Sequence, residues 1–153
     1  MLQDGLAAYQ ATGAALARPY FLVLLAQAYH SMDRVEAGLA VLTEALTVID
    51  KTSEQQYVAE VHRLIGDLRL AQSGPGQHGE VAAESFHRAL GVARQQQAKS
   101  LELRAALSLA RLWQQQGKGA EARQLLTEVY GWFTEGFDTA DLQEARVLLE
   151  VLA

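Results

Sequence analysis

A glycine-rich segment is the first group of residues whose types and spacing could support chemistry. Residues 74–79 read Gly-Pro-Gly-Gln-His-Gly, which fits the G-x-G-x-x-G pattern of dinucleotide-binding loops. That chemistry needs a strand before the loop, a helix after it and an acidic residue about 20 positions further on. A helical pattern precedes the segment instead, and glutamines occupy 95–97, where the acidic residue would fall. We therefore interpret residues 74–79 as a loop inserted between two helices.

Glu84 and His87 form the second group, a Glu-x-x-His pair of the kind that di-iron bundles use, because residues three apart project from one helix face. Such a centre needs a second pair and two more glutamates, and the sequence contains no second Glu-x-x-His. The four histidines show no four-residue spacing typical of a zinc helix, and there is no cysteine. We interpret the pair as a surface feature and predict no metal and no cofactor.

Nucleophilic catalysis has no support in the sequence. There is no cysteine to act as a thiol nucleophile, and no G-x-S-x-G elbow presents a serine. The sequence therefore predicts a protein without catalytic residues, and an enzyme or small-ligand binder is the least favoured alternative.

The composition indicates an all-α protein. Alanine, leucine and glutamine supply 26, 24 and 15 of the 153 residues, whereas valine and isoleucine together supply 13, and this balance favours helices over strands. The formal net charge of −5 disfavours direct binding to nucleic acid or to an anionic membrane. The longest apolar run, 20–26, is too short to cross a bilayer. The N-terminus has no signal-peptide pattern, so we expect a cytoplasmic protein.

Hydrophobic periodicity predicts eight helices. They cover residues 2–12, 18–31, 34–51, 54–73, 80–97, 100–116, 118–133 and 139–152. Asp33 and Ser53, each followed three residues later by Glu or Gln, fit the capping box at a helix start. Gly117 is predicted to break one helix from the next. Because the connections are short, consecutive helices should pack as antiparallel hairpins.

Three segments share one spacing of small, aromatic and turn residues, which indicates an internal repeat. The matched sets are Ala26, Tyr29, Asp33, Gly38, Leu42 and Ala45; Gly66, Ala82, Phe86 and Ala89; and Ala110, Trp113, Gly117, Ala122, Leu126 and Val129. Small residues allow two helices to approach closely, and a large residue one turn away fills the gap between hairpins. We predict one domain over 1–153, with repeats at 18–52, 54–98 and 100–134, a leading helix at 2–12 and a capping helix at 139–152.

This spacing resembles the tetratricopeptide repeat (TPR), a helix-turn-helix unit. The resemblance implies a right-handed α-α superhelix, a solenoid of stacked antiparallel hairpins. More narrowly, residues 97–113 and 129–145 resemble the C-terminal TPR region of bacterial signalling proteins with a STAND-type ATPase core, which often carry an adenylate/guanylate cyclase or a LuxR-type DNA-binding domain. The resemblance implies that the chain is the C-terminal module of such a protein, or a free-standing relative. No Walker motif occurs in the 153 residues.

The predicted function is a non-catalytic scaffold that binds a protein, a peptide segment or a sibling domain. The first helix of each hairpin should line a concave face, and the predicted binding residues are Tyr20, Gln27, His30, Arg63, Asp67, Arg104, Arg111 and Gln114. The residues at the corresponding positions do not match the carboxylate clamp of the TPR family. We expect Arg63→Glu and Arg111→Glu to weaken binding without unfolding the chain.

The alternative function is self-association, with a homo-oligomer formed through a C-terminal aromatic cluster. Four aromatic residues within eight positions cannot all face one stripe of a helix, so some of them are free to cap the end of the solenoid or to contact a second copy. They are Tyr130, Trp132, Phe133 and Phe137.

Overall fold

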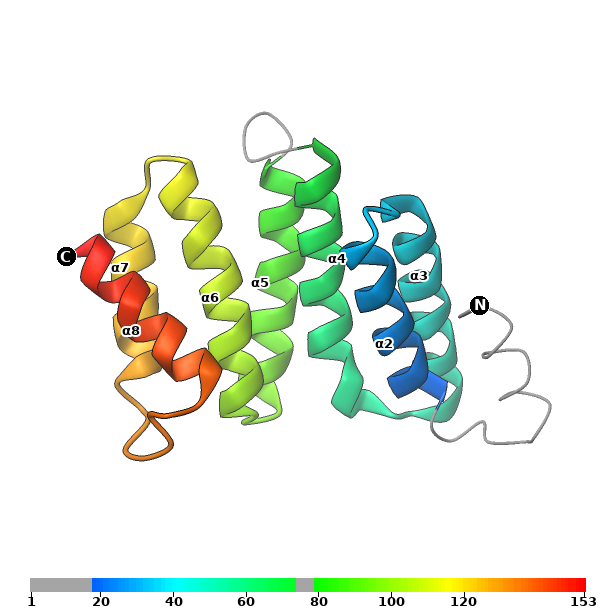
Figure 1. Cartoon of the computed structure of the whole chain (residues 1–153). Coiled ribbons are helices and arrows are strands. Elements are labelled where there is room, and N and C mark those ends of the chain that lie inside the picture. The colour runs from blue at the N-terminus through cyan, green and yellow to red at the C-terminus, as the bar shows by residue number, and fades with distance from the viewer. Residues whose placement is uncertain (1–17, 74–78) are drawn as a thin grey trace.

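Every regular element in the described residues, 18–73 and 79–153 of the computed structural model, is helical (Figure 1). The predicted all-α class is confirmed for this part of the chain, and the predicted helix over 2–12 lies outside it. Seven α-helices and one 3-10 turn follow one another: α2 (Arg18–Ser31), α3 (Val35–Thr52), η2 (Gln55–Tyr57), α4 (Val58–Ser73), α5 (Gly79–Gln95), α6 (Lys99–Gln115), α7 (Gly119–Tyr130) and α8 (Ala140–Leu152).

Several helix ends differ from the sequence prediction. The helix predicted over 118–133 ends at Tyr130, because the N–H groups of Trp132 and Phe133 bond three residues back, to Val129 and Tyr130, and tighten the chain into a turn. Asp33 and Ser53, predicted as N-caps, both adopt left-handed backbone with φ of 56° and 60°. Ser53 instead closes α3, since its N–H bonds to the carbonyl of Ile49 at 2.7 Å. Both residues therefore end a helix rather than begin one.

Three of the hairpin turns share one geometry. Asp33, Gln97 and Gly117 each have positive φ. In each turn the N–H of the following residue bonds to the carbonyl five positions before it, at distances of 2.8, 2.9 and 2.7 Å respectively. This is the Schellman arrangement, which satisfies the last carbonyls of a helix and reverses the chain within a few residues. The short turns explain why successive helices are antiparallel.

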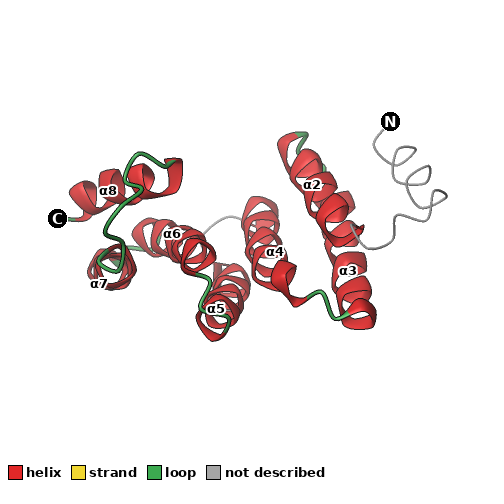
Figure 2. Ribbon diagram, turned by 90° about the horizontal axis from the view of Figure 1, so that it is seen from below, coloured by secondary structure: helices red, strands yellow, loops and turns green. Residues whose placement is uncertain are grey.

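The helices form a row with two layers (Figures 1 and 2). Seen from below in Figure 2, roughly down the helix axes, α2, α4, α6 and α8 lie towards one side, and α3, α5 and α7 lie towards the other. Each helix packs against the next one in sequence. In addition, α2 contacts α4, α4 contacts α6, and α6 contacts α8. One layer is therefore continuous from α2 to α8.

Gly66 and Gly38 allow close contacts between neighbouring helices. A Cβ added to Gly66 of α4 would lie 2.4 Å from Cε1 of Phe86, a residue of α5 that is fully buried. A Cβ added to Gly38 of α3 would lie 2.9 Å from Cδ1 of Leu68 of α4. These contacts agree with the expectation that small residues let neighbouring helices approach closely, but the large side chain at each contact comes from the facing helix rather than from one turn away.

The buried residues form two hydrophobic clusters. The first runs from Leu22 to Leu68 and is supplied by α2, α3 and α4. The second runs from Ala82 to Leu148 and is supplied by α5 to α8. Leu70 of α4 packs against the second cluster, so α4 contributes to both.

Candidate functional site

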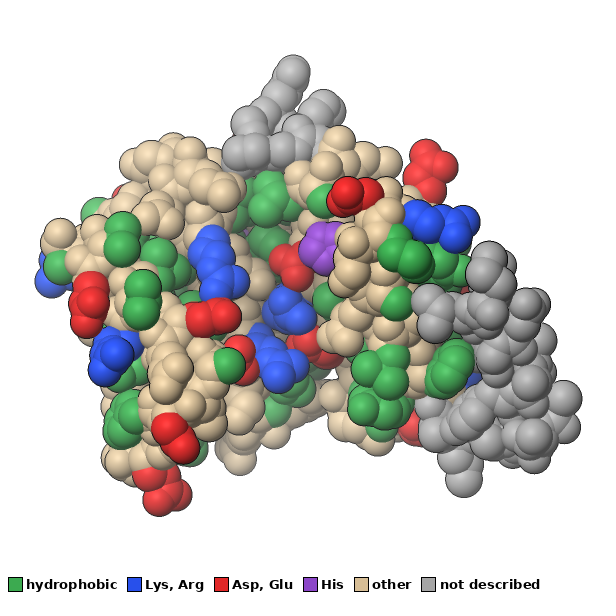
Figure 3. Space-filling view, in the orientation of Figure 1, with side chains coloured by type: hydrophobic (Ala, Val, Ile, Leu, Met, Phe, Trp, Pro, Cys, Tyr) green, Lys and Arg blue, Asp and Glu red, His purple; other side chains and the backbone are tan. Residues whose placement is uncertain are grey.

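The layer formed by α2, α4, α6 and α8 carries the predicted binding residues. We name it the even-helix face and define it by one set of side chains: Tyr20, Leu24, Gln27, His30, Glu60, Arg63, Asp67, Arg104, Arg111, Gln114, Asp141 and Glu144. In Figure 3 basic and acidic side chains alternate down the middle of this face, and hydrophobic side chains gather over α2 and over α8. The face thus has a charged centre between two apolar ends.

Arg63 of α4 is the centre of the charged band. Its Nε donates to both Glu60 carboxylate oxygens, at 3.1 and 3.2 Å, and its Nη1 donates to Asp67 at 2.9 Å. The side chain is 17% exposed. Burial lowers the pKa of Arg63, but the hydrogen bonds and negative charges of Glu60 and Asp67 more than offset this effect and raise it overall. Arg63 is therefore always charged and is held by its own helix.

Arg104 of α6 joins three helices of the face. Its Nε donates to Asp141 of α8 at 2.9 Å, and its Nη1 lies 3.4 Å from Glu60 of α4. The hydrogen bond to Asp141 is the main reason that the pKa of Arg104 is raised. Charge-assisted bonds of this kind fix side-chain direction as well as adding energy. The network Glu60–Arg63–Arg104–Asp141 therefore fixes the relative positions of α4, α6 and α8.

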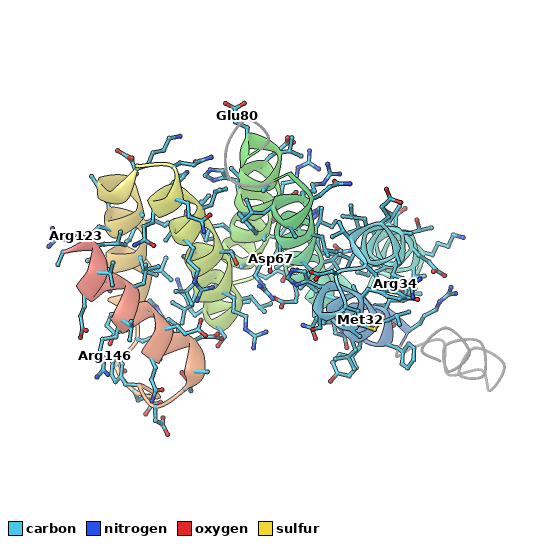
Figure 4. All side chains as sticks on the ribbon, turned by 45° about the horizontal axis from the view of Figure 1, so that its top comes forward. Met32, Arg34, Asp67, Glu80, Arg123 and Arg146 are labelled. Atoms are coloured by element: carbon cyan, nitrogen blue, oxygen red, sulfur yellow. The ribbon has the colours of Figure 1, made fainter. Side chains whose placement is uncertain are left out.

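Arg111 and Asp67 connect the network to its neighbours. Arg111 of α6 donates to Glu144 of α8, and both side chains are about half exposed. Burial raises the pKa of Asp67, while the charge of Arg63 and smaller effects of nearby His30 and Arg111 oppose it. His30 of α2 therefore lies within electrostatic range of Asp67, which Figure 4 labels near the middle of the row. The structure brings three of the predicted residues, Arg63, Asp67 and Arg104, into one network, and His30 and Arg111 act electrostatically on Asp67.

Tyr20 and Gln27 lie apart from this network, on α2. Tyr20 is 52% exposed and packs against Tyr57, with ring centroids 6.2 Å apart. Leu24, one turn along, is 44% exposed, and Gln27 is partly buried. These residues follow one helical stripe and form the apolar end of the face over α2.

Gln114 lies at the opposite end, in an open groove between α6 and α8. The groove has a volume of about 710 Å³. Its lining combines polar groups with exposed valines: Arg111, Gln114, Gln115, Ala140, Gln143, Glu144, Val147, Leu148 and Val151. The predicted residues therefore extend along the whole even-helix face rather than converging on one point.

The aromatic cluster predicted for self-association, which begins at the last residue of α7, divides into two pairs. Tyr130 packs against Phe137 with centroids 5.8 Å apart, and Trp132 packs edge-on against Phe133 at 5.2 Å. Lys99 lies 5.3 Å from the centroid of the Trp132 ring, a distance at which a cation is attracted by the aromatic face. Trp132 is 57% exposed, so it is the member of the cluster most available to another molecule.

The residues considered above for metal or dinucleotide binding make ordinary structural contacts. Glu84 bonds to Arg88 at 2.9 Å, and His87 packs against Trp113 with centroids 5.7 Å apart. In residues 18–73 and 79–153 no group of three or more His, Asp or Glu side chains could hold a metal ion. Residues 74–78 lie outside the described part, but the elements on either side of them, α4 and α5, are helices. A strand therefore does not precede the glycine-rich segment.

Sequence reasoning missed three acidic residues of the site: Glu60, Asp141 and Glu144. Glu60 lies 44 positions before Arg104, and Asp141 and Glu144 lie 37 and 33 positions after the arginines that they bind. Nothing in the local pattern pairs such distant residues. A signal for Glu60 was present, since the Glu-x-x-Arg spacing to Arg63 places both side chains on one helix face.

Comparison with known proteins assigns no family: no protein-family model matches the chain, and no curated protein matches it. None of the helices in the described ranges combines the length and apolar character needed to cross a bilayer. The arrangement of the even-helix face is therefore the observation from which a function can be inferred.

Proposed function

We propose that this chain is a non-catalytic protein–protein interaction module with a TPR-like right-handed solenoid fold, and that its even-helix face binds a polypeptide segment. The continuous packing of α2, α4, α6 and α8 supports the solenoid, because stacked hairpins place the first helix of each pair along one side. The observation that carries the binding proposal is the charged band between two exposed apolar ends.

Such a face can provide both affinity and selectivity. Apolar side chains such as Tyr20 and Leu24 lose water contact when a partner covers them, and this is the main source of affinity. The charged band selects partners by charge complementarity. Because Arg63 and Arg104 are already held by carboxylates, they need little ordering when a partner binds.

The partner is a protein segment, a peptide or a sibling domain of a larger chain. The resemblance of 97–113 and 129–145 to TPR regions of bacterial signalling proteins supports the narrower proposal that the chain is the C-terminal module of a STAND-type ATPase, cyclase or LuxR-type regulator. In that setting the module acts in the cytoplasm, and any catalysis belongs to other domains. The module would transmit the binding of a partner to them.

A displayed library of random peptides tests the proposal. Peptides selected on the wild-type chain should carry apolar residues beside a charged centre, and their affinity should fall about tenfold or more in Tyr20→Ala or Arg111→Glu. Lys51→Glu provides a matched control, because Lys51 is exposed on α3, outside the even-helix face. If the variants of the face and the control bind selected peptides equally well, the even-helix face is not the binding site and the proposal fails.

Arg63→Glu is unsuitable for this experiment, contrary to the expectation from sequence. The substitution would place a third carboxylate beside Glu60 and Asp67, which Arg63 now bridges. Like charges at this separation with little water between them repel strongly. Arg111, 48% exposed and bound to a single carboxylate, can be reversed with far less effect on folding.

A further inference from the structure

The surface of α8 that points away from the core carries a second apolar stripe. Leu142, Ala145 and Leu148 are buried against the rest of the molecule. Val147 and Val151, on another side of the helix, are 53% and 63% exposed. Together with Ala140 they lie at helical spacing and line the groove of about 710 Å³ between α6 and α8. A helix that is apolar on two sides is typical of one that packs against two neighbours.

Two unpaired charges lie on one side of this stripe. Arg146 and Glu150 are both exposed, and within the described ranges neither forms an ion pair. Figure 4 labels Arg146 on α8, at the end of the row. The two residues are four positions apart, each two positions from Leu148. If a two-fold axis crosses the helix at the level of Leu148, Arg146 of one copy therefore lies level with Glu150 of the other.

We propose that α8 is the surface through which a second copy of this chain binds, with the two α8 helices antiparallel about a two-fold axis near Leu148. In this arrangement Arg146 of each copy faces Glu150 of the other, which gives two symmetry-related pairs of opposite charge. The exposed valines of the two stripes cover one another, and the two α6/α8 grooves meet. In an isologous contact of this kind the same patch serves both partners. Because Arg111, Gln114 and Glu144 line this groove, the second copy covers the α8 end of the even-helix face, and a polypeptide bound at that end would compete with it.

The expected association is weak. A helix of 13 residues is about 20 Å long, so a contact centred on two such helices falls at the low end of interface sizes. We therefore expect a dissociation constant in the micromolar range, with monomers prevailing in dilute samples. The ion pairs are exposed at the edge of the contact, so added salt should weaken the dimer.

Sedimentation equilibrium of the full chain, from low micromolar to near-millimolar concentration, tests the proposal with charge-reversed variants. Arg146→Glu places acidic residues opposite one another, and Glu150→Arg places basic residues opposite one another. Each variant alone should raise the dissociation constant about tenfold. An equimolar mixture of the two should associate as tightly as the wild type, because acidic positions then face basic ones. Lys51→Glu, at the other end of the row, should leave the dissociation constant unchanged.

Each result has a distinct meaning. Rescue by the mixture supports the antiparallel α8 contact, since no change in folding would be repaired by a second variant. A wild-type chain that stays monomeric throughout overturns the proposal, as does a dimer that both single variants preserve. If the dimer is lost in Trp132→Ala but kept in Arg146→Glu, the aromatic cluster is the contact instead. Peptide binding by Tyr20 and Arg111 is measured separately, so failure of the dimer leaves the proposed function standing.

Discussion

Replacing Gly66 with alanine should destabilise the protein, although alanine is the better helix former. In the interior of a helix this change favours folding by about 1 kcal/mol. At Gly66, however, the new methyl group would lie 2.4, 2.6 and 3.0 Å from three atoms of the Phe86 ring. Phe86 is fully buried, so the ring cannot withdraw into solvent. Overpacking of this kind costs about 1–3 kcal/mol, and three contacts at or below 3 Å place the cost near the top of that range. The net loss should be about 1–2 kcal/mol.

Gly91→Ala is the matched control. Gly91 lies inside α5 with nothing within 4 Å of an added Cβ, so it should show the helix-propensity gain alone, about 0.5–1 kcal/mol. Thermal denaturation followed by circular dichroism should give a lower Tm for Gly66→Ala and a higher Tm for Gly91→Ala. Adding Phe86→Leu to Gly66→Ala should cost less than Phe86→Leu costs alone. If both glycine variants raise the Tm, the close contact between α4 and α5 does not exist as described.

Three further predictions concern charge, pH and a turn. Arg63→Ala leaves Glu60 buried without its main partner and should cost about 2 kcal/mol or more in urea denaturation, whereas Arg111→Ala should stay within about 0.5 kcal/mol; equal losses would contradict the difference in burial. Burial and then the charge of Arg88 lower the pKa of His62 below its ordinary 6.5, so the folded state binds this proton less tightly. The free energy of unfolding should have its full value above pH 6.5 and decline as the pH falls through the folded-state pKa of His62. In His62→Gln, the part of the decline that is due to His62 should be absent. Gln97 has a left-handed backbone conformation at a helix end, which glycine adopts more readily, so Gln97→Gly should raise the Tm by a few degrees. A lower Tm would show that the Gln97 side chain contributes more stability than the backbone strain costs.

The helices could be predicted from sequence more surely than their ends. Periodicity located every helix of the described part, because each one buries a stripe of apolar side chains. The predicted helix starts at Asp33 and Ser53 were wrong for a chemical reason. Asp and Ser are favoured at N-caps because their side chains accept backbone hydrogen bonds, but short polar residues are also found in left-handed turns after helices. The same residue types fit both roles, and only the three-dimensional turn decides between them.

Only part of the candidate site could be predicted from the sequence. Arg63, Arg104 and Arg111 could be selected from sequence because helical spacing places them on one side. Their partners could not, since Asp141 and Glu144 come from a helix that reaches α6 only after two intervening turns. Sequence spacing alone therefore does not show that Arg63, a predicted binding residue, is already held by Glu60 and Asp67 of its own helix.

The division of the hydrophobic core bears on how the molecule opens. One buried cluster belongs to α2–α4 and the other to α5–α8, and the two halves meet where α4 packs against α5, around Gly66, Phe86 and Leu70. Proteins built in this way open in parts, and amide hydrogens in each part exchange at their own rate. A partner that spans the even-helix face would touch both halves at once. Its binding would then slow exchange in the half it contacts less, by making the two halves open together.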